Sequence, residues 1–383
     1  MIGDISAFSF EKVFDAGYDF FSTIFEYLLK DYNSNGGGTY AEYYTPHSVA
    51  QIIAKLLVGD NPNLKSMTCY DPAAGTGTLV IALAHAIGEQ KCSVYTQDIS
   101  DKSSTMMMLN LILNGMSHSL TNVIKGNTLS HPFHKDGEKL KQFDYVVSNP
   151  PFKLDFSDYQ SDLKNDPNKG RFFAGIPNIP KTKKQSMEIY LCFLQHVLYS
   201  IKDGGKGAIV VPTGFLTAQS GIAQKIKQYL VDNRFLKGVI SMPSNIFANT
   251  GTNVSVVFID KTALTDNAVL IDASKLGETI KDGKNQKTVL NTDDINKIIE
   301  AFAENKAIDD FSVNVKYDEI KEKNYSLSAG QYFEIKIEYV ELTQEEFNQK
   351  ISDYTSKLDE LFKEGNSLEA EIKKSLNELI FKE

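Results

Sequence analysis

The sequence predicts an α/β fold in which helices cover both faces of a doubly wound, largely parallel sheet of seven strands. Short apolar runs alternate with helical stretches from Met67 to Lys261, and this alternation is typical of strands joined by crossover helices. Between the last two runs lie only residues 243–252, too few for a crossover helix. We therefore expect the seventh strand to lie antiparallel to the sixth.

The chain begins with a predicted short helical segment, residues 1–35, in which aromatic and leucine side chains recur near helical spacing. Glycines at 36–38 predict a loop or hinge after it. Thr45 suits the N-cap of a second helix, and Pro46 suits its first position because no hydrogen bond is lost there.

The seven expected strands are apolar runs of four to eight residues, at Met67–Asp71, Ser93–Asp98, Asn122–Lys125, Phe143–Ser148, Gly207–Pro212, Leu236–Ser241 and Asn253–Asp260. Helices are expected between most of them, at Leu79–Ile87, Lys102–Leu113, Ser186–Ile201 and Ile222–Val231. Residues 36–262 would form the main domain. Residues 263–340 are more polar and less regular, which predicts a small appendage.

Residues 341–383 predict one long helix. Apolar side chains recur there in alternating steps of four and three residues, at Phe347, Ile351, Tyr354, Leu358, Leu361, Leu368 and Ile372, with Gly365 at the one remaining step. This is the spacing of a coiled-coil seam. Two interpretations stay open: the helix packs on its own domain, or it pairs with a helix of a partner.

Composition places the chain among ordinary folded proteins. Of the 383 residues 42% are hydrophobic and 23% are charged, which argues against disorder and against a disulfide scaffold. No apolar stretch approaches the roughly 18 residues needed to span a bilayer, and no signal peptide is evident. We therefore expect a cytoplasmic protein without membrane contact.

The three cysteines, Cys69, Cys92 and Cys192, form no CxxC pair and have no ligand spacing with the histidines, so no metal site is expected. The net charge of −9 argues against a protein that binds nucleic acid over its whole surface. Residues 153–185 differ, because seven cations outnumber four aspartates there. Contact with nucleic acid would be local or shared with a partner.

The first motif, from Asp71 to Leu79, reads DPAAGTGTL and joins a strand end to a helix start. Glycines let a ligand approach the backbone closely, and the helix start favours anionic groups. Asp71 would repel a pyrophosphate by up to about 4 kcal/mol at ~4 Å. The same carboxylate suits a ligand with an ammonium and a sulfonium, such as S-adenosylmethionine. Asp98 ends the next strand, where acids commonly bind ribose hydroxyls.

The second motif is Asn149-Pro150-Pro151-Phe152, at the end of the fourth strand. The two prolines remove backbone donors, so carbonyls are left as acceptors in fixed directions. The Asn149 amide oxygen is a further acceptor, and the Phe152 ring offers a face for stacking. Two acceptors and a stacking ring fit the exocyclic amine of a flat base.

Together with residues 42–46, EYYTP, these two motifs resemble the amino-directed DNA adenine-N6 methyltransferases. More narrowly, the chain is similar to the modification (M) subunits of type I restriction-modification systems. The similarity continues through residues 208–212, 238–243 and 324–327 and covers about residues 17–335. It implies a class I methyltransferase (Rossmann-like) fold and transfer of a methyl group from S-adenosylmethionine to adenine in DNA.

The resemblance also implies roles for single residues. Residues that would bind the donor come from several loops: Glu42, Tyr43, Tyr44, Thr45, Pro46, His47, Asp71, Ala73, Ala74, Gly75, Gly77, Asp98 and Asn127. Asn149 and the Pro150 carbonyl would accept from the adenine amine, Pro151 would fix the turn, and Phe152 would stack on a flipped base. Asn127 stands where the family usually has Asp, so we expect weaker donor binding.

The family further implies partners: DNA, a specificity (S) subunit that contacts the C-terminal helix, a second M subunit and a restriction (R) subunit. Motor activity would belong to another chain, since no G-x-x-x-x-G-K-[ST] motif occurs. Cytosine-C5 chemistry is excluded because no cysteine follows a proline. The alternatives that stay open are methylation of cytosine-N4 or of a protein glutamine, and a non-catalytic subunit.

Overall fold

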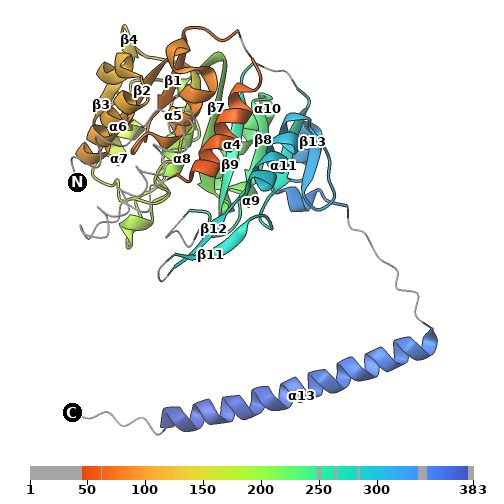
Figure 1. Cartoon of the computed structure of the whole chain (residues 1–383). Coiled ribbons are helices and arrows are strands. Elements are labelled where there is room, and N and C mark those ends of the chain that lie inside the picture. The colour runs from red at the N-terminus through yellow and green to blue at the C-terminus, as the bar shows by residue number, and fades with distance from the viewer. Residues whose placement is uncertain are drawn as a thin grey trace, which may run out of the picture. The chain divides into compact units, whose positions relative to one another are not determined.

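Among the described residues of the computed structural model, nine strands form one mixed sheet, ordered β13-β10-β8-β9-β7-β6-β1-β2-β3 (Figure 1). The structure describes residues 45–61, 63–247, 252–262, 265–282, 285–334 and 343–377. The predicted N-terminal helical segment and Glu42, Tyr43 and Tyr44 lie outside the described residues. The chain divides into two units between Phe333 and Glu334.

The strands of this sheet are β1 (Met67–Asp71), β2 (Cys92–Asp98), β3 (Val123–Lys125), β6 (Phe143–Ser148), β7 (Ile201–Pro212), β8 (Leu236–Ser241), β9 (Val254–Asp260), β10 (Asn267–Asp272) and β13 (Ser312–Lys316). The first seven correspond to the seven predicted strands. The predicted fold class is confirmed.

Five strand pairs are parallel: β1 with β2, β2 with β3, β1 with β6, β6 with β7, and β8 with β10. Strand β9 lies between β7 and β8 and is antiparallel to both, which confirms the prediction for the seventh strand. Because β1, β2, β3 and β6 are mutually parallel neighbours, the loops that follow them meet at one edge of the sheet.

The longer helices of the first unit are α4 (His47–Val58), α5 (Thr78–Ile87), α6 (Asp101–Leu113), α8 (Tyr190–Ser200), α10 (Gly221–Asp232) and α11 (Thr292–Ala303). Shorter ones are α7 (Gln160–Lys164), α9 (Gly214–Thr217) and α12 (Tyr317–Glu322). The prediction that Thr45 is the N-cap of α4 is wrong: Pro46 takes that position, and the helix begins one residue later, at His47.

The sheet is buried on both faces. Side chains of α4, α5 and α11 pack in one apolar cluster, and those of α8, α10 and α12 pack in another. Neighbouring residues of a strand point to opposite faces, so Val210 belongs to the first cluster and Val211 to the second. Burial on both sides explains why the strands are continuous apolar runs.

The segment expected as an irregular appendage, residues 263–340, contributes to the main sheet. Strand β10 extends the sheet beside β8, β13 pairs antiparallel with β10, and α11 lies between them in sequence. Two hairpins stand apart from the sheet: β4 (Lys135–Asp136) with β5 (Lys139–Leu140), and β11 (Glu278–Asp282) with β12 (Asn285–Val289).

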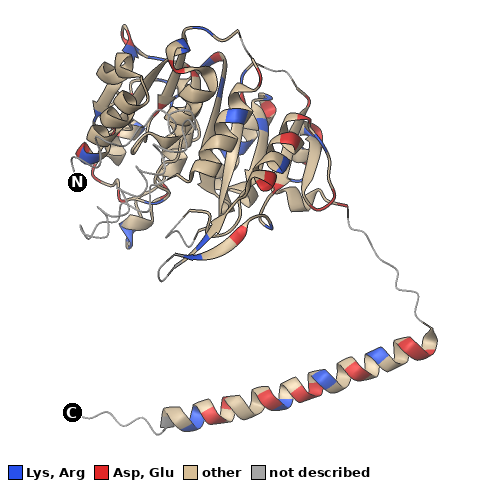
Figure 2. Ribbon diagram, in the orientation of Figure 1, with Lys and Arg blue, Asp and Glu red and all other residues tan. Residues whose placement is uncertain are grey.

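The second unit is dominated by one helix, α13 (Gln344–Asn377), as the spacing of apolar residues predicts. Gly365 lies inside the helix and does not end it. Acidic and basic side chains are interspersed along its whole length (Figure 2). As an isolated helix it leaves its apolar seam open, with about half of the surface of Phe347 and Ile351 exposed.

Candidate donor and target site

A small pocket lies at the edge of the sheet where β1 and β6 end. Residues from three separate loops line it: Thr45, Asp71, Ala73, Ala74, Thr76, Thr78, Leu79 and Asn149. Its empty volume is about 240 Å³. The structure thus brings the DPAAGTGTL turn, the first residue of NPPF and the residue before Pro46 to one place, although 104 residues separate Thr45 from Asn149.

The turn between β1 and α5 is held by its own backbone. The Asp71 carboxylate accepts a hydrogen bond from the Ala73 amide at 3.0 Å, and the Gly77 amide donates to the Ala74 carbonyl at 2.8 Å. Gly77 has a φ of +92°, and a Cβ there would lie 2.0 Å from the Met107 sulfur of α6. The left-handed backbone therefore favours glycine at this position, and any larger residue would also displace the end of the Met107 side chain.

Asp98 ties the end of β2 to the same turn. One carboxylate oxygen accepts from the Gly75 amide at 2.8 Å, and the other accepts from the Ser100 amide at 2.8 Å. Burial raises the pKa of this carboxyl, and the two amides oppose that rise. Asp98 therefore shapes the glycine turn besides presenting a carboxylate at its edge.

Asp71 is buried at the floor of the pocket, with 1% of its surface exposed. Burial raises the pKa of its carboxyl to about 7, the Ala73 amide opposes the rise, and the nearby charge of Asp98 adds to it. Two carboxylates that share a poorly solvated site favour a cation. The electrostatics of the pocket thus suit a positively charged ligand.

The NPPF loop forms the other side of the pocket. The Asn149 amide nitrogen donates to the Thr45 hydroxyl at 3.1 Å, which fixes the side chain and leaves its oxygen outside this contact. Pro150 is buried and Phe152 is half-buried. The Phe152 ring meets Tyr190 of α8 edge to face, with centroids 6.4 Å apart.

The sequence profile of a family described as "N-6 DNA Methylase" matches residues 16–340 of the 383. The chain belongs to the N-6 DNA methylase family.

Two relatives of this chain are methylase subunits of type I restriction enzymes. The methylase subunit of type I restriction enzyme MpnII from Mycoplasma pneumoniae is 30% identical over 355 residues, which are 90% of this chain and 62% of that protein. The MjaIX methylase subunit from Methanocaldococcus jannaschii is 26% identical over 379 residues, 95% of this chain and 64% of that protein.

A solved structure agrees with these relatives. The crystal structure of a type I restriction-modification system methyltransferase subunit from Streptococcus thermophilus superposes with a TM-score of 0.67 at 26% identity. The match covers 81% of this chain and 62% of that one. This chain therefore spans less than two thirds of each of these three proteins.

Asn127 lies in the loop after β3 and stabilises that loop. Its amide oxygen accepts from the Leu129 amide at 3.0 Å and from the Ser130 amide at 3.3 Å. Thr128 links the loop to the first motif, because its hydroxyl donates to the Pro72 carbonyl at 2.6 Å. This hydrogen bond thus joins the loops after β1 and β3 directly.

Sequence analysis missed a buried arginine in the basic segment, residues 153–185. Arg171 is 1% exposed, and its guanidinium donates to Asp166 at 2.6 Å and to the Leu129 and Thr128 carbonyls at 2.9 Å each. Of the seven cations in residues 153–185, Arg171 is therefore not available to contact DNA. Asp166, five residues earlier, was the only signal in the sequence.

The same arginine reaches the core of the sheet through a histidine. The Arg171 Nε donates to His196 Nδ1 at 3.0 Å, and the other ring nitrogen of His196 lies 3.1 Å from the Tyr70 hydroxyl. Burial, and then the charge of Arg171, place the pKa of His196 well below its ordinary value. A neutral histidine thus connects the basic segment to the residue before Asp71.

A larger groove, with an empty volume of about 1460 Å³, lies near the NPPF loop. Its walls come from the basic segment and from the region of β7, α9 and α10, and they include Lys153, Tyr190, Pro212 and Phe215. Tyr190 contacts the Phe152 ring on one side and Phe215 on the other. The groove therefore lies next to Phe152, the last residue of the loop whose first residue, Asn149, lines the small pocket.

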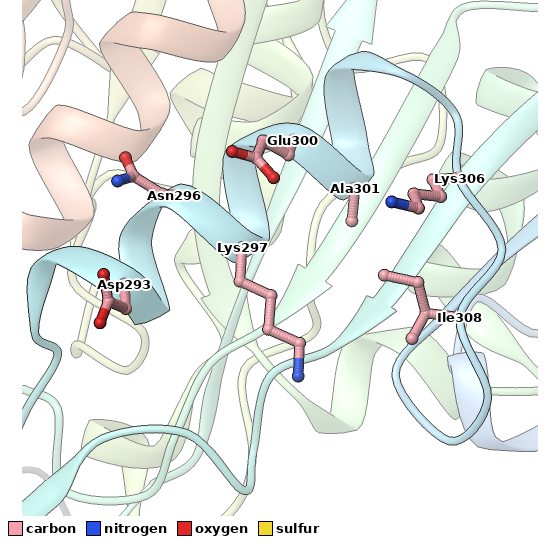
Figure 3. A pocket seen from close by; sticks show the side chains of 7 residues that line it. All are labelled: Asp293, Asn296, Lys297, Glu300, Ala301, Lys306 and Ile308. Carbon is pink, nitrogen blue, oxygen red and sulfur yellow. The ribbon is translucent and has the colours of Figure 1, made fainter.

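A third hollow, on α11, has no part in this arrangement. Asp293, Asn296, Lys297, Glu300 and Lys306 surround it with charges of both signs (Figure 3). Among the residues that the structure describes, no cluster of acids, histidines or cysteines could hold a metal ion. No described helix is both long and apolar enough to cross a membrane.

Proposed function

We propose that this chain is a site-specific DNA adenine-N6 methyltransferase, the modification subunit of a type I restriction-modification complex. The observation that carries the proposal is the meeting of two motifs at one pocket. The glycine turn with Asp71 and the NPPF residue Asn149 line the same cavity. A non-catalytic subunit would need neither this acidic pocket nor the acceptor beside it.

S-adenosylmethionine fits the pocket because it carries an ammonium and a sulfonium. Asp71 and Asp98 supply negative charge where the donor's amino and ribose groups would lie, and Ala73, Ala74 and Gly75 form the turn beneath. Thr45, Pro46 and His47 would border the donor's methionine end, and Gly77 keeps α5 close to the turn. S-adenosylmethionine, when bound, supplies a methyl group that is already activated.

The loop between Asn149 and Phe152 would receive the adenine. The Asn149 amide oxygen and the Pro150 carbonyl would each accept one hydrogen of the exocyclic amine, which aims the nitrogen lone pair at the methyl group. Pro151 fixes the turn, and Phe152 would stack on the flipped base. The exocyclic nitrogen would form a bond to the methyl carbon, and the carbon–sulfur bond of the donor would break with its electron pair remaining on sulfur. The amine would release one proton to water.

Asn127 is proposed to border the donor's adenine ring. Its amide oxygen already accepts hydrogen bonds from two backbone amides. Any contact with the donor would therefore use the hydrogen-bonding groups of the Asn127 side chain that these two bonds leave over. This supports the expectation of weaker donor binding than an aspartate would give.

DNA and other subunits are the proposed partners. The named relatives are methylase subunits of type I restriction enzymes, and we propose that this chain likewise works with a specificity subunit, a second copy of itself and a restriction subunit. The specificity subunit would contact α13 and choose the DNA sequence.

The direct test is methyl transfer from isotope-labelled S-adenosylmethionine to DNA, with and without a co-expressed specificity subunit, followed by identification of the product by mass spectrometry. N6-methyladenine that appears only with the specificity subunit supports the whole proposal. N4-methylcytosine would show that cytosine is the substrate in place of adenine. Label on a protein glutamine instead of DNA would show that the substrate is a protein. Label on neither would point to a non-catalytic subunit.

A further inference from the structure

The seam of α13 has a definite heptad register. Phe347, Tyr354, Leu361 and Leu368 occupy the d positions, and Ile351, Leu358, Gly365 and Ile372 occupy the a positions. The seam continues for almost four heptads without a break in the helix. Each of the seven large side chains leaves roughly half or more of its surface exposed when the helix is alone.

The seam is complementary to itself when two copies run antiparallel. A two-fold axis between Leu358 and Leu361 places these leucines opposite one another, and Tyr354 then faces Gly365 of the second copy. Ile351 faces Leu368 and Phe347 faces Ile372 by the same symmetry. The largest side chain of the seam thus lies opposite the position that lacks one.

The charges beside the seam have the same symmetry. The g positions carry Lys350 and Lys357 in the first half of the helix and Glu364 and Glu371 in the second. Antiparallel helices bring g positions together, so Lys350 meets Glu371 and Lys357 meets Glu364, each twice. All four flanking pairs are therefore attractive, because the g positions are basic in the first half of α13 and acidic in the second.

A parallel pair would lose both features. Gly365 would face Gly365 and leave a gap in the seam, since a missing side chain forfeits its packing contacts. The g positions would meet e positions of the second copy, which places Glu364 beside Glu369 and Lys357 beside Phe362. Parallel pairing thus gives repulsion where antiparallel pairing gives attraction.

We propose that α13 binds α13 of a second copy of this chain as an antiparallel two-stranded coiled coil. The interface is isologous, so each contact occurs twice about the two-fold axis. Thr355, Phe362 and Leu376 at e positions then line the opposite side of the pair, where a specificity subunit would find apolar surface. The pairing needs neither donor nor DNA, so its test is independent of methyl transfer.

Two charge-reversal variants of the full chain test the register. The first is Lys350→Glu with Lys357→Glu, and the second is Glu364→Lys with Glu371→Lys. Each turns all four flanking pairs repulsive, and sedimentation equilibrium should show self-association weakened by about tenfold or more. An equimolar mixture restores all four attractive pairs, so it should associate as tightly as the natural chain.

A distance measurement fixes the direction of the helices. The three natural cysteines are buried, so a spin label on Glu345→Cys would report from the helix start. In the antiparallel register the two labels should lie about 45 Å apart, because about 29 residues separate them along the axis at a rise of ~1.5 Å per residue. In a parallel pair the labels would be level with one another and about 20 Å apart.

Several outcomes would overturn the proposal. The first is that the full chain remains a monomer in sedimentation equilibrium at concentrations at which coiled coils of this length normally associate. Another is a mixture of the two variants that associates no better than either alone. A chain lacking residues 341–383 that still dimerises as tightly as the full chain would place the interface elsewhere.

Discussion

Asp71 has opposite effects on stability and on binding. Its pKa lies near 7 in the folded chain, above the ordinary value of 3.8, so the folded state binds this proton more tightly than the unfolded state. The contribution of the group to stability is full below about pH 4 and is lost as the pH rises to about 7. A cationic donor reverses the balance because it favours the ionised carboxylate.

We therefore expect S-adenosylmethionine to raise the melting temperature more at pH 8 than at pH 6. Asp71→Asn should make the chain without donor more stable at pH 8, by about 1–3 kcal/mol after discounting a shift of this size, and should reduce the pH dependence of donor binding. Thermal unfolding at both pH values, with and without donor, measures these effects. An unchanged pH profile in Asp71→Asn would remove this carboxyl from the site.

Asp98→Ala should weaken donor binding by about 1.5–3 kcal/mol, the range for a hydrogen bond to a charged group. Isothermal titration calorimetry measures the change. Because Asp98 also accepts from the Gly75 and Ser100 amides, the melting temperature must be recorded alongside. Asp101→Ala, an exposed acid three residues later that pairs with Lys125, is the matched control and should change neither quantity much.

Asn149→Ala should abolish methylation while donor affinity stays nearly intact, because the side chain acts on the target amine. Thr45 loses one hydrogen-bond donor in this variant, at a net cost of about 0.5–1.5 kcal/mol. Single-turnover methyl transfer and donor titration on the same sample separate the two roles. A collapse of donor binding with the fold preserved would contradict the assignment.

At the scale of elements, Arg171 joins three segments of the chain. Its partners belong to the loop after β3, to the basic segment and to α8. Removing one partner of a buried ion pair costs about 3–5 kcal/mol, so Arg171→Met should lower the melting temperature by several degrees. Arg171→Lys should recover only part, because a lysine cannot reproduce the planar set of donors.

The same variants should weaken donor binding, since the loop that holds Asn127 loses two anchoring bonds to its Thr128 and Leu129 carbonyls. Lys169→Met is the matched control: it removes an exposed cation of the same segment and should alter neither stability nor donor affinity. Equal effects of Lys169→Met and Arg171→Met would show that charge, and not the buried bonds, matters.

The strands were predictable because both faces of the sheet are buried, which makes each central strand a continuous apolar run. β13 was not, because this short edge strand, Ser312–Lys316, carries polar residues among few apolar ones. β10 lies inside the sheet, and sequence analysis missed its short apolar run, Ala268–Ile271, within a more polar segment. β7 begins six residues before its predicted start, since the sequence KDGGK interrupts the apolar pattern without ending the strand.

The candidate site was predictable where a motif is local. The two motifs predict which loops line the pocket, because each motif places its characteristic residues and the end of a strand within one short stretch of sequence. The contact between Thr45 and Asn149, the support of Gly75 by Asp98, and the bonds of Arg171 join residues far apart in the chain. Only the packed structure shows such pairs.

At the scale of the whole molecule, the chain has little cationic surface to offer DNA. The net charge is −9, and Arg171, within the one basic segment, is buried. Neutralisation of phosphates supplies much of DNA affinity, so we expect tight binding at physiological salt only together with other subunits. This is the physical reason to expect that methylation depends on assembly.

Deletion of residues 341–383 should leave donor binding intact and abolish both association with the specificity subunit and sequence-specific methylation. The donor pocket lies wholly in the first unit, so it should not sense the loss. Co-purification with the specificity subunit and donor titration measure the two outcomes. Normal co-purification of the truncated chain would place the partner contact elsewhere, whereas a lower melting temperature with normal assembly would show that the helix packs on its own domain.

The buried bonds of Arg171 have a consequence for cooperativity. The segment that follows Phe152 and the loop that holds Asn127 share one guanidinium, so ordering either segment lowers the entropic cost of ordering the other. Donor and DNA then bind with a common coupling free energy. By thermodynamic reciprocity, the factor by which the donor tightens DNA binding equals the factor by which DNA tightens donor binding. In Arg171→Met both factors should fall towards one together.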